Sequence, residues 1–319
     1  MGYHNHWWVM LLCVVAVQAT GQNFPERPMR IIVAFSSGTA ADIVARQIAF
    51  KLADSFGKQV VVENRDGAAG TIGTGMAARA SPDGHTMLIA SPSVVISPLL
   101  IKDLPYDDFR DFAPVSVMAN FPTVLIVGAQ SKANSVKDLI DLAKATPGKL
   151  NYATAGRGSA SHLSAELMRS MSGIDIVEIA YKTTNQALSD TVTGEVAIYF
   201  PNLAAALPLI KAGRLKALAV TSTKRSAAAP EIPAMAETLP GYEAASWYGI
   251  VVPARTPKFA IAKLHAEITR ALQAPDTRER FLSLGGDIIA GTPEDLGRTM
   301  RGGAEKWGKM VRDFEAQGR

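Results

Sequence analysis

Cysteine is almost absent from this chain of 319 residues. The single cysteine, Cys13, lies in a short apolar run, Trp7–Val17, that is too short for a comfortable membrane span. Val17 and Ala19 place small side chains before a cleavage point, so we expect residues 1–19 to be a secretory signal peptide cleaved after Ala19. The segment before Trp7 has no Lys or Arg, which leaves an uncleaved anchor as the alternative. The mature chain would have no disulfide, thiol nucleophile or zinc–thiolate site.

Long hydrophobic runs and concentrated charge are also lacking. No later run reaches about 18 apolar residues, so we expect the mature protein to be soluble. The net charge is only +4, and the Lys and Arg residues are scattered among acids instead of forming a stripe with aromatics. These features argue against a nucleic-acid partner. A hydrophobic content of 48% is that of an ordinary globular protein.

Motifs for metals, cofactors and hydrolysis are missing as well. The histidines after the signal show no metal-ligand spacing, and they are His85, His162 and His265. Gly70–Gly75 departs from the dinucleotide-binding spacing, so we expect no cofactor. Ser159 and Ser161 lie too close to His162 in sequence to form a nucleophile–base pair, and no G-x-S-x-G motif surrounds them. A serine hydrolase is therefore a minor alternative.

Strand and helix patterns alternate along the chain after the expected signal peptide, which predicts an α/β protein with mainly parallel sheets. We expect strands at 29–34, 59–63, 86–90, 121–127, 176–180, 194–200, 215–221 and 246–252. We expect helices at 41–56, 136–145, 185–193, 257–273, 277–284 and 292–315. The strand at 121–127 could cross into a second lobe, and the strand at 246–252 would return. Lobe 1 would then comprise residues 24–124 and 246–319, and lobe 2 residues 125–245.

Two segments share one pattern: a strand-like run, a Gly/Ser/Thr loop and an amphipathic helix. The first is Arg30–Arg46 and the second is Leu150–Leu167. In open α/β sheets, ligands bind where such loops leave the carboxyl ends of strands. A helix N-terminus also offers unpaired N–H groups and a positive dipole end, which suit an anion. We therefore expect a cleft in which both loops hold one small anion.

Individual residues of these loops allow more than one interpretation. The hydroxyls of Ser159 and Ser161 could donate to a carboxylate or merely cap a helix, and the cluster favours binding. Phe35 could cover the apolar part of a ligand. Asp42 could stabilise the helix dipole or bind an amino group of the ligand. Arg157 could hold the anion or face solvent.

Several short motifs follow one another in a specific order. They are Phe24–Pro28 with Ile31–Val33, Phe35–Asp42, Val61–Arg65 with Gly67–Gly70, Ser81–Gly84, Tyr106–Phe109, Tyr152–Leu163, Tyr181–Lys182, and Gly291–Glu294 with Trp307. In order and spacing, they resemble the tripartite tricarboxylate transporter substrate-binding proteins, the Bug receptors. The resemblance spans essentially the whole mature chain.

This resemblance implies a type II-like, two-lobed periplasmic binding protein that closes around a small organic carboxylate and performs no catalysis. It also implies a monomer that passes its solute to the large and small subunits of a membrane permease; a sensor docking on a signalling protein is the alternative. Carried over residue by residue, the ligand-binding positions are Phe35, Ser36, Ser37, Gly38, Thr39, Ala40, Asp42, Ser91, Ser93, Thr154, Ala155, Gly158, Ser159, Ser161, His162, Tyr181, Lys182, Thr183 and Asn202.

The chain departs from the family pattern beside the expected cleft. Thr39 replaces one of two paired glycines, and Thr183 replaces the glycine after the Tyr-Lys pair. Thr184–Ala187 lacks the usual proline. Pro201–Asn202 replaces an acid that is often found there, which favours a ligand without an amino group. These changes concern the identity of the substrate and not the fold.

Overall fold

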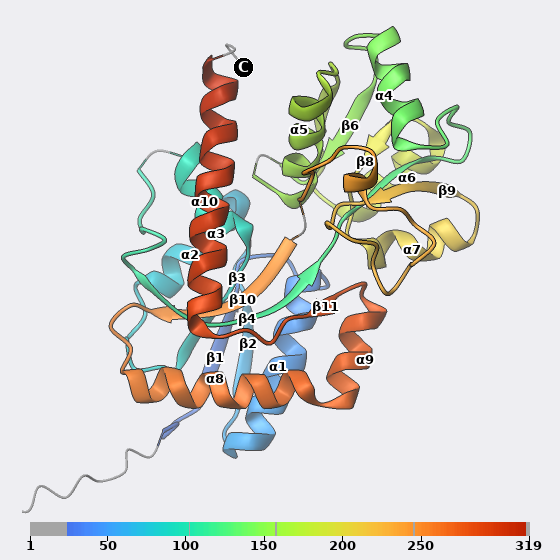
Figure 1. Cartoon of the computed structure of the whole chain (residues 1–319). Helices are drawn as coiled ribbons and strands as arrows, with labels where there is room; N and C mark the ends of the chain where they lie inside the picture. Colours follow the sequence, from blue (N-terminus) through green and yellow to red (C-terminus); the bar gives the residue numbers. More distant parts are fainter. Residues whose placement is uncertain (1–23, 102, 157, 245, 317–319) are drawn as a thin grey trace, which may run out of the picture.

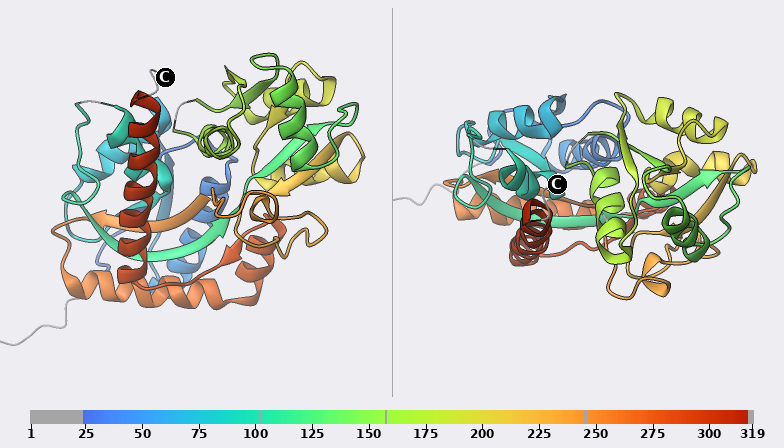
Figure 2. Two further views of the ribbon diagram at one scale, coloured as in Figure 1. Left: turned by 45° about the horizontal axis from the view of Figure 1, so that its top comes forward. Right: turned by 90° about the horizontal axis from the view of Figure 1, so that it is seen from above.

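The computed structural model describes residues 24–316 except 102, 157 and 245 (Figure 1). The expected signal peptide and Arg157 therefore lie outside the described residues. The described chain forms two sheets flanked by helices, and Figures 1 and 2 show the second sheet with its helices beside the first. The expected α/β class is confirmed. Within the described part of the chain, no helix is long and apolar enough to cross a membrane.

The first sheet has six strands in the order β11-β4-β10-β3-β1-β2. Their bounds are β1 Met29–Val33, β2 Val60–Asn64, β3 Thr86–Ala90, β4 Phe112–Phe121, β10 Ser246–Pro253 and β11 Asp287–Ile288. Successive side chains of β1 enter different cores, as the alternation of a strand requires. Ile32 joins the core that contains Trp307, whereas Ile31 and Val33 join the core that contains Leu264. Both faces of this sheet are therefore covered.

The helices on the first sheet come from both ends of the chain. Their bounds are α1 Ala40–Phe56, α2 Thr71–Ala78, α3 Pro92–Leu100, α8 Lys258–Gln273, α9 Pro275–Ser283 and α10 Pro293–Ala316, with a 3-10 turn η1 at Ala68–Gly70. Helix α1 begins at a Thr39 cap and ends at Gly57, whose φ of 61° is left-handed. Helix α10 runs along the first sheet in Figure 1 and packs on α3, where Gly308 lies close to Leu99.

The second sheet has five strands in the order β7-β6-β8-β5-β9. Its elements are β5 Val124–Gly128, α4 Val136–Ala145, β6 Asn151–Thr154, α5 Ala160–Ser172, β7 Val177–Ala180, α6 Thr184–Thr193, β8 Ile198–Tyr199, α7 Leu203–Lys211 and β9 Leu215–Val220, followed by a 3-10 turn η2 at Met235–Glu237. Serine and threonine side chains cap α4, α5 and α6 at their N-termini. This is the pattern expected of helices that follow polar loops.

Both sheets are mixed, which corrects the expectation of mainly parallel sheets. The pairs formed through β–α–β units are parallel: β1 with β2 and β3, and β6 with β7 and β8. Strand β10 is antiparallel to β3 and β4, and β5 is antiparallel to β8 and β9. The antiparallel strands β4, β5, β9 and β10 adjoin the crossings between the sheets, where no crossover helix imposes a parallel direction.

Several predicted elements also change. The predicted strand at 121–127 joins the last residue of β4 to β5, whereas Pro122, which has no backbone N–H, and Thr123 separate the two strands. The rest of β4 was not predicted. The predicted strand at 194–200 shortens to Ile198–Tyr199. Helices α3 and α7 were not predicted, and each contains an internal proline, Pro98 and Pro208, that disguises its helical pattern.

Candidate functional site

The β1–α1 loop is held by hydrogen bonds within itself and to neighbouring residues of the first sheet's side. Thr39 caps α1 by accepting from the Asp42 N–H at 3.4 Å. Ser36 Oγ donates to Asp66 Oδ2 at 2.8 Å, Ser37 Oγ donates to Asp42 Oδ2 at 3.3 Å, and Thr39 Oγ1 donates to the Ser36 carbonyl at 2.9 Å. Since each hydroxyl has one hydrogen, these bonds use all three. The loop therefore offers an anion its backbone N–H groups at the α1 N-terminus, where Ala40 begins the helix.

The Asp42 carboxylate is buried at 2% exposure and serves the loop itself. It accepts from the Gly38 N–H at 3.0 Å, from Asn64 Nδ2 at 2.9 Å and from Arg46 Nε at 3.0 Å. Burial raises the pKa of Asp42, but the hydrogen bonds from Arg46, Gly38 and Asn64 outweigh it and hold the pKa below its usual value. Of the two roles considered for Asp42, these contacts support the structural one.

The β6–α5 loop is organised in a similar way. Ser159 caps α5 by accepting from the His162 N–H at 3.3 Å, and Ser161 Oγ accepts from the Ala155 N–H at 3.1 Å. The Gly158 N–H donates to His162 Nδ1 at 3.4 Å, so the histidine orients the loop. Gly158 has a φ of 80°, a left-handed conformation that favours glycine.

The two serine hydroxyls form a hydrogen bond with each other. Ser159 Oγ and Ser161 Oγ lie 3.1 Å apart, so one hydroxyl donates to the other. Because each hydroxyl has a single hydrogen, this contact leaves one hydrogen for a ligand and not two. Besides capping α5, the pair holds the Ala155 N–H, and a carboxylate placed there could receive one serine hydrogen bond in addition to the N–H groups of the first turn of α5.

Acidic residues that the sequence did not single out support this loop from behind. Thr154 Oγ1 donates to Glu178 Oε1 at 2.7 Å and accepts from the Gly156 N–H at 3.0 Å. The buried Glu166 accepts from Tyr152 Oη at 2.5 Å and from Arg169 Nη1 at 2.6 Å. The bond between Glu178 and Thr154 is set by strand pairing, and the bond between Tyr152 and Glu166 by the packing of α5 on β6, so neither shows in a local motif.

The other predicted positions also lie at carboxyl ends of strands. Ser91 and Ser93 begin α3 and form a buried hydrogen bond of 2.9 Å, so Ser93 is helical and not part of a loop. Tyr181 Oη donates to Asp190 Oδ2 at 2.8 Å, and Lys182 is exposed. Thr183 caps α6 by accepting from the Gln186 N–H. Asn202 precedes α7 and pairs with Thr123 in an isolated bridge.

Strand pairing brings these positions together within each sheet. Parallel pairing of β1 with β3 places the Phe35 loop beside Ser91, and parallel pairing of β6 with β7 and β8 places the Thr154, Tyr181 and Asn202 segments side by side. The two sheets meet where a Cβ on Gly158 would lie 3.6 Å from Leu100 Cδ1 and 3.9 Å from Ile96 Cγ2 of α3. Besides the predicted Ser93, α3 thus brings Ile96 and Leu100, which were not predicted, to the candidate site.

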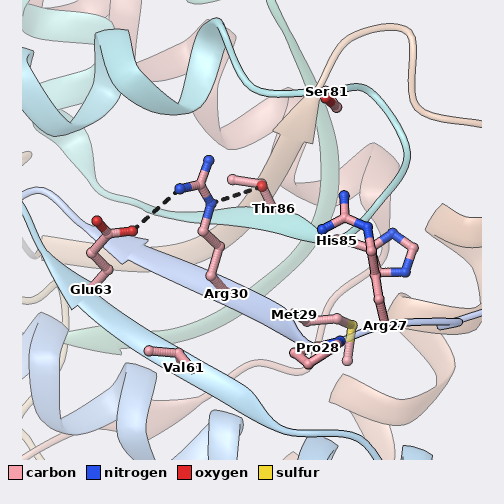
Figure 3. Close-up of a pocket in the computed structure, with 9 residues that line it drawn as sticks. All are labelled: Arg27, Pro28, Met29, Arg30, Val61, Glu63, Ser81, His85 and Thr86. Carbon is pink, nitrogen blue, oxygen red and sulfur yellow. Dashed lines mark hydrogen bonds and ion pairs between the residues drawn. The ribbon is translucent and has the colours of Figure 1, made fainter.

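A separate pocket of about 280 Å³ lies at the opposite end of the first sheet (Figure 3). Arg27, Arg30 and His85 line it near the starts of β1 and β3. Its guanidinium groups are engaged: Arg30 bonds Thr86 and Glu63, and Arg27 bonds Asp83. Because α/β proteins bind ligands at the carboxyl ends of strands, we place the functional site at the loops and not here.

Among the described residues, no group of three or more His, Cys, Asp or Glu side chains is placed to hold a metal ion. The glycine-rich segment Gly70–Gly75 forms most of α2 instead of a phosphate loop. A Cβ on Gly73 would lie 2.7 Å from the Arg65 carbonyl oxygen and 2.9 Å from Ala34 Cα. This glycine therefore lets α2 approach the base of the β1–α1 loop.

Comparison with known proteins places the chain in a family. The sequence model of the tripartite tricarboxylate transporter family receptor matches residues 44–315. The chain belongs to this receptor family.

Individual relatives agree with that assignment. BugT of Bordetella pertussis is 35% identical over 95% of this chain and 94% of its own length. The structure of Rhodopseudomonas palustris MatC, which has malate bound, is 29% identical with a TM-score of 0.81, covering 90% of this chain and 100% of MatC. The structure of R. palustris Rpa4515 with adipate is 33% identical with a TM-score of 0.84, covering 91% of this chain and 97% of Rpa4515. The resemblance read from the sequence motifs is confirmed.

Proposed function

We propose that this chain is an extracytoplasmic receptor that binds a small carboxylate between two lobes and delivers it to the large and small membrane subunits of a tripartite tricarboxylate transporter. Membership of the receptor family supports this proposal most strongly. Two relatives of known structure hold dicarboxylates, adipate and malate. The receptor would work in the periplasm as a monomer without catalysis, after removal of residues 1–19.

The lobes of the proposed receptor are residues 24–124 with 246–319, and residues 125–245. The carboxylate would meet the N-termini of α1 and α5, which begin at Ala40 and Ala160. Helix dipoles and first-turn N–H groups favour an anion at both places. The remaining serine hydrogen of the Ser159–Ser161 pair would complete the contact. The other ligand-binding positions implied by the sequence, apart from the buried Asp42, would line the cleft around it.

Calorimetry and thermal unfolding test this function. We expect adipate, malate or another small carboxylate to raise the melting temperature, since a ligand at 100 times its Kd stabilises a protein by about 2.7 kcal/mol. A double variant with Ser159→Ala and Ser161→Ala should bind at least tenfold more weakly. Ser172→Ala, at the far end of α5, is the matched control and should bind like the wild type. A carboxylate panel without any shift would refute the proposal, and native mass spectrometry of the purified protein would identify a retained ligand.

A further inference from the structure

Four buried hydroxyl groups gather where the chain passes between the sheets. Thr123 lies between β4 and β5, Thr221 directly follows β9, and Tyr242 lies in the segment that leads back to β10. Ser164 lies on α5, one turn after the helix begins. The exposed fractions are 1% for Thr123 and 0% for Ser164, Thr221 and Tyr242. We call residues 122–123 and 221–244 the crossing segments.

The hydroxyls form a chain of hydrogen bonds with one consistent direction. Ser164 Oγ donates to the Ala160 carbonyl at 2.7 Å, so at its 3.1 Å contact with Thr123 Oγ1 it accepts. Thr123 Oγ1 has then spent its hydrogen on Ser164, so Thr221 Oγ1 is the donor toward Thr123. Its one hydrogen faces both Thr123 Oγ1 at 2.9 Å and the Thr123 carbonyl oxygen at 3.0 Å. Thr221 Oγ1 in turn accepts from the Thr123 N–H at 3.0 Å. The hydroxyls of Ser164, Thr123 and Thr221 thus each donate their one hydrogen to a protein acceptor.

Further contacts tie the second crossing segment to the same point. Tyr242 Oη donates to the Ser164 carbonyl at 2.8 Å, and the Ala244 N–H donates to the Thr221 carbonyl at 3.0 Å. The Thr221 N–H donates to the Thr123 carbonyl at 2.9 Å. Both crossing segments are therefore bonded to one turn of α5, and that turn directly follows the β6–α5 loop.

Breaking this chain costs more than an exposed hydrogen bond would. Water does not reach the hydroxyls, so a rotation of α5 against the crossing segments would leave buried donors or acceptors without partners. Motion of the second sheet relative to the first must bend the crossing segments, as in hinge closure of two-lobed proteins. This chain of hydrogen bonds makes the start of α5 move when the crossing segments bend.

We propose that the Thr221–Thr123–Ser164 chain couples the β6–α5 loop to the crossing segments, so that an anion bound at the loop moves the second sheet as one rigid body. This inference rests on the proposed receptor function. Thr123 and Ser164 are then positioning residues for closure, which act through the loop without touching the ligand.

Distance measurements between spin labels test the coupling. In a Cys13→Ser background, Lys144→Cys on α4 and Ala266→Cys on α8 place one label at an exposed position beside each sheet. Ser164→Ala removes one hydroxyl, and Thr123→Val removes another while keeping its volume. Thr191→Ala is the matched control, because Thr191 is also 0% exposed and its Oγ1 also donates one turn back, to the Ala187 carbonyl at 2.7 Å.

Without ligand, we expect Ser164→Ala and Thr123→Val to widen the distribution of distances between the labels, whereas Thr191→Ala keeps the width of the wild type. With adipate as the probe, the two variants should shorten the distance by less than half as much as the wild type and bind roughly three- to tenfold more weakly. Should Ser164→Ala fail to fold, the isosteric Thr123→Val variant carries the test.

Wild-type width, closure and affinity in both variants would overturn the coupling, and so would an equal effect of Thr191→Ala. A wild-type protein that binds no carboxylate would refute the receptor function instead. The widths measured without ligand would then decide the coupling alone.

Discussion

Asn64 Nδ2 at the end of β2 lies 2.9 Å from Asp42 Oδ1 and donates a hydrogen bond to it. The same amide group donates to the Phe35 carbonyl at 3.0 Å, and Asn64 Oδ1 accepts from Arg46 Nη2 at 3.1 Å. One side chain thereby connects the strand β2, the β1–α1 loop and the first helix. The loop has its shape because a neighbouring strand holds it.

Replacing this amide should loosen the loop. We expect Asn64→Leu to lower the free energy of unfolding by about 1 to 2 kcal/mol, because the buried Asp42 carboxylate loses a donor. Carboxylate binding should weaken in parallel. Urea unfolding and calorimetry measure the two effects. Asn134→Ala, at an exposed position just before α4, is the control, and an equal loss there would show that the effect is not specific to the loop.

A buried carboxyl in the loop before β4 makes stability depend on pH. Burial, together with the charge of Asp107, raises the pKa of Asp108 to about 6. The folded protein therefore keeps a proton on Asp108 that the unfolded chain releases near pH 4, and stability falls as the pH rises from about 4 to about 6.

Asp108→Asn should remove that fall and stabilise the protein at pH 7 by about 1 to 3 kcal/mol. Thermal unfolding between pH 4 and pH 8 checks this, with the exposed Asp54→Asn as the control. The pKa assigned to Asp108 would be wrong if the variant and the wild type had parallel profiles.

Gly73 supports the site by its lack of a side chain. A Cβ there would approach the Arg65 carbonyl oxygen to 2.7 Å and Ala34 Cα to 2.9 Å, so Gly73→Ala must push α2 away from Arg65 and from Ala34, where the β1–α1 loop begins. We expect a loss of about 1 to 3 kcal/mol in the free energy of unfolding. Gly302→Ala in α10 meets no atom within 4 Å and should instead stabilise the protein by roughly 0.5 to 1 kcal/mol. Denaturant unfolding that gave both variants the same sign would contradict the packing argument.

Glu178 should matter for binding although it lies behind the loop. It accepts from Thr154 Oγ1, which in turn accepts from the Gly156 N–H. In Glu178→Leu the threonine hydroxyl loses its acceptor and can rotate away from Gly156. We expect carboxylate affinity to fall roughly three- to tenfold, which corresponds to one lost hydrogen bond. Calorimetry compares it with the exposed Glu231→Gln, and unchanged binding in Glu178→Leu would exclude the positioning role.

The sequence by itself determined the α/β class, the family and the strand–loop–helix units around Phe35 and Ser159. These depend on local patterns: buried strand runs, glycine and serine loops, and caps such as Thr39 and Ser159, which form their bonds within a few residues. The break between β4 and β5 also has a local cause, Pro122, but the apolar residues on both sides of it predicted one continuous strand.

Only the tertiary structure decided which groups of the loops remain available to a ligand. Three groups are occupied by hydrogen bonds inside the protein: Asp42 with Asn64, Ser36 with Asp66, and Thr154 with Glu178. Each partner comes from another segment of the chain. The antiparallel pairing of β10 with β3 likewise joins strands that lie far apart in sequence. Such contacts depend on where distant segments meet in space, and no local pattern encodes that meeting.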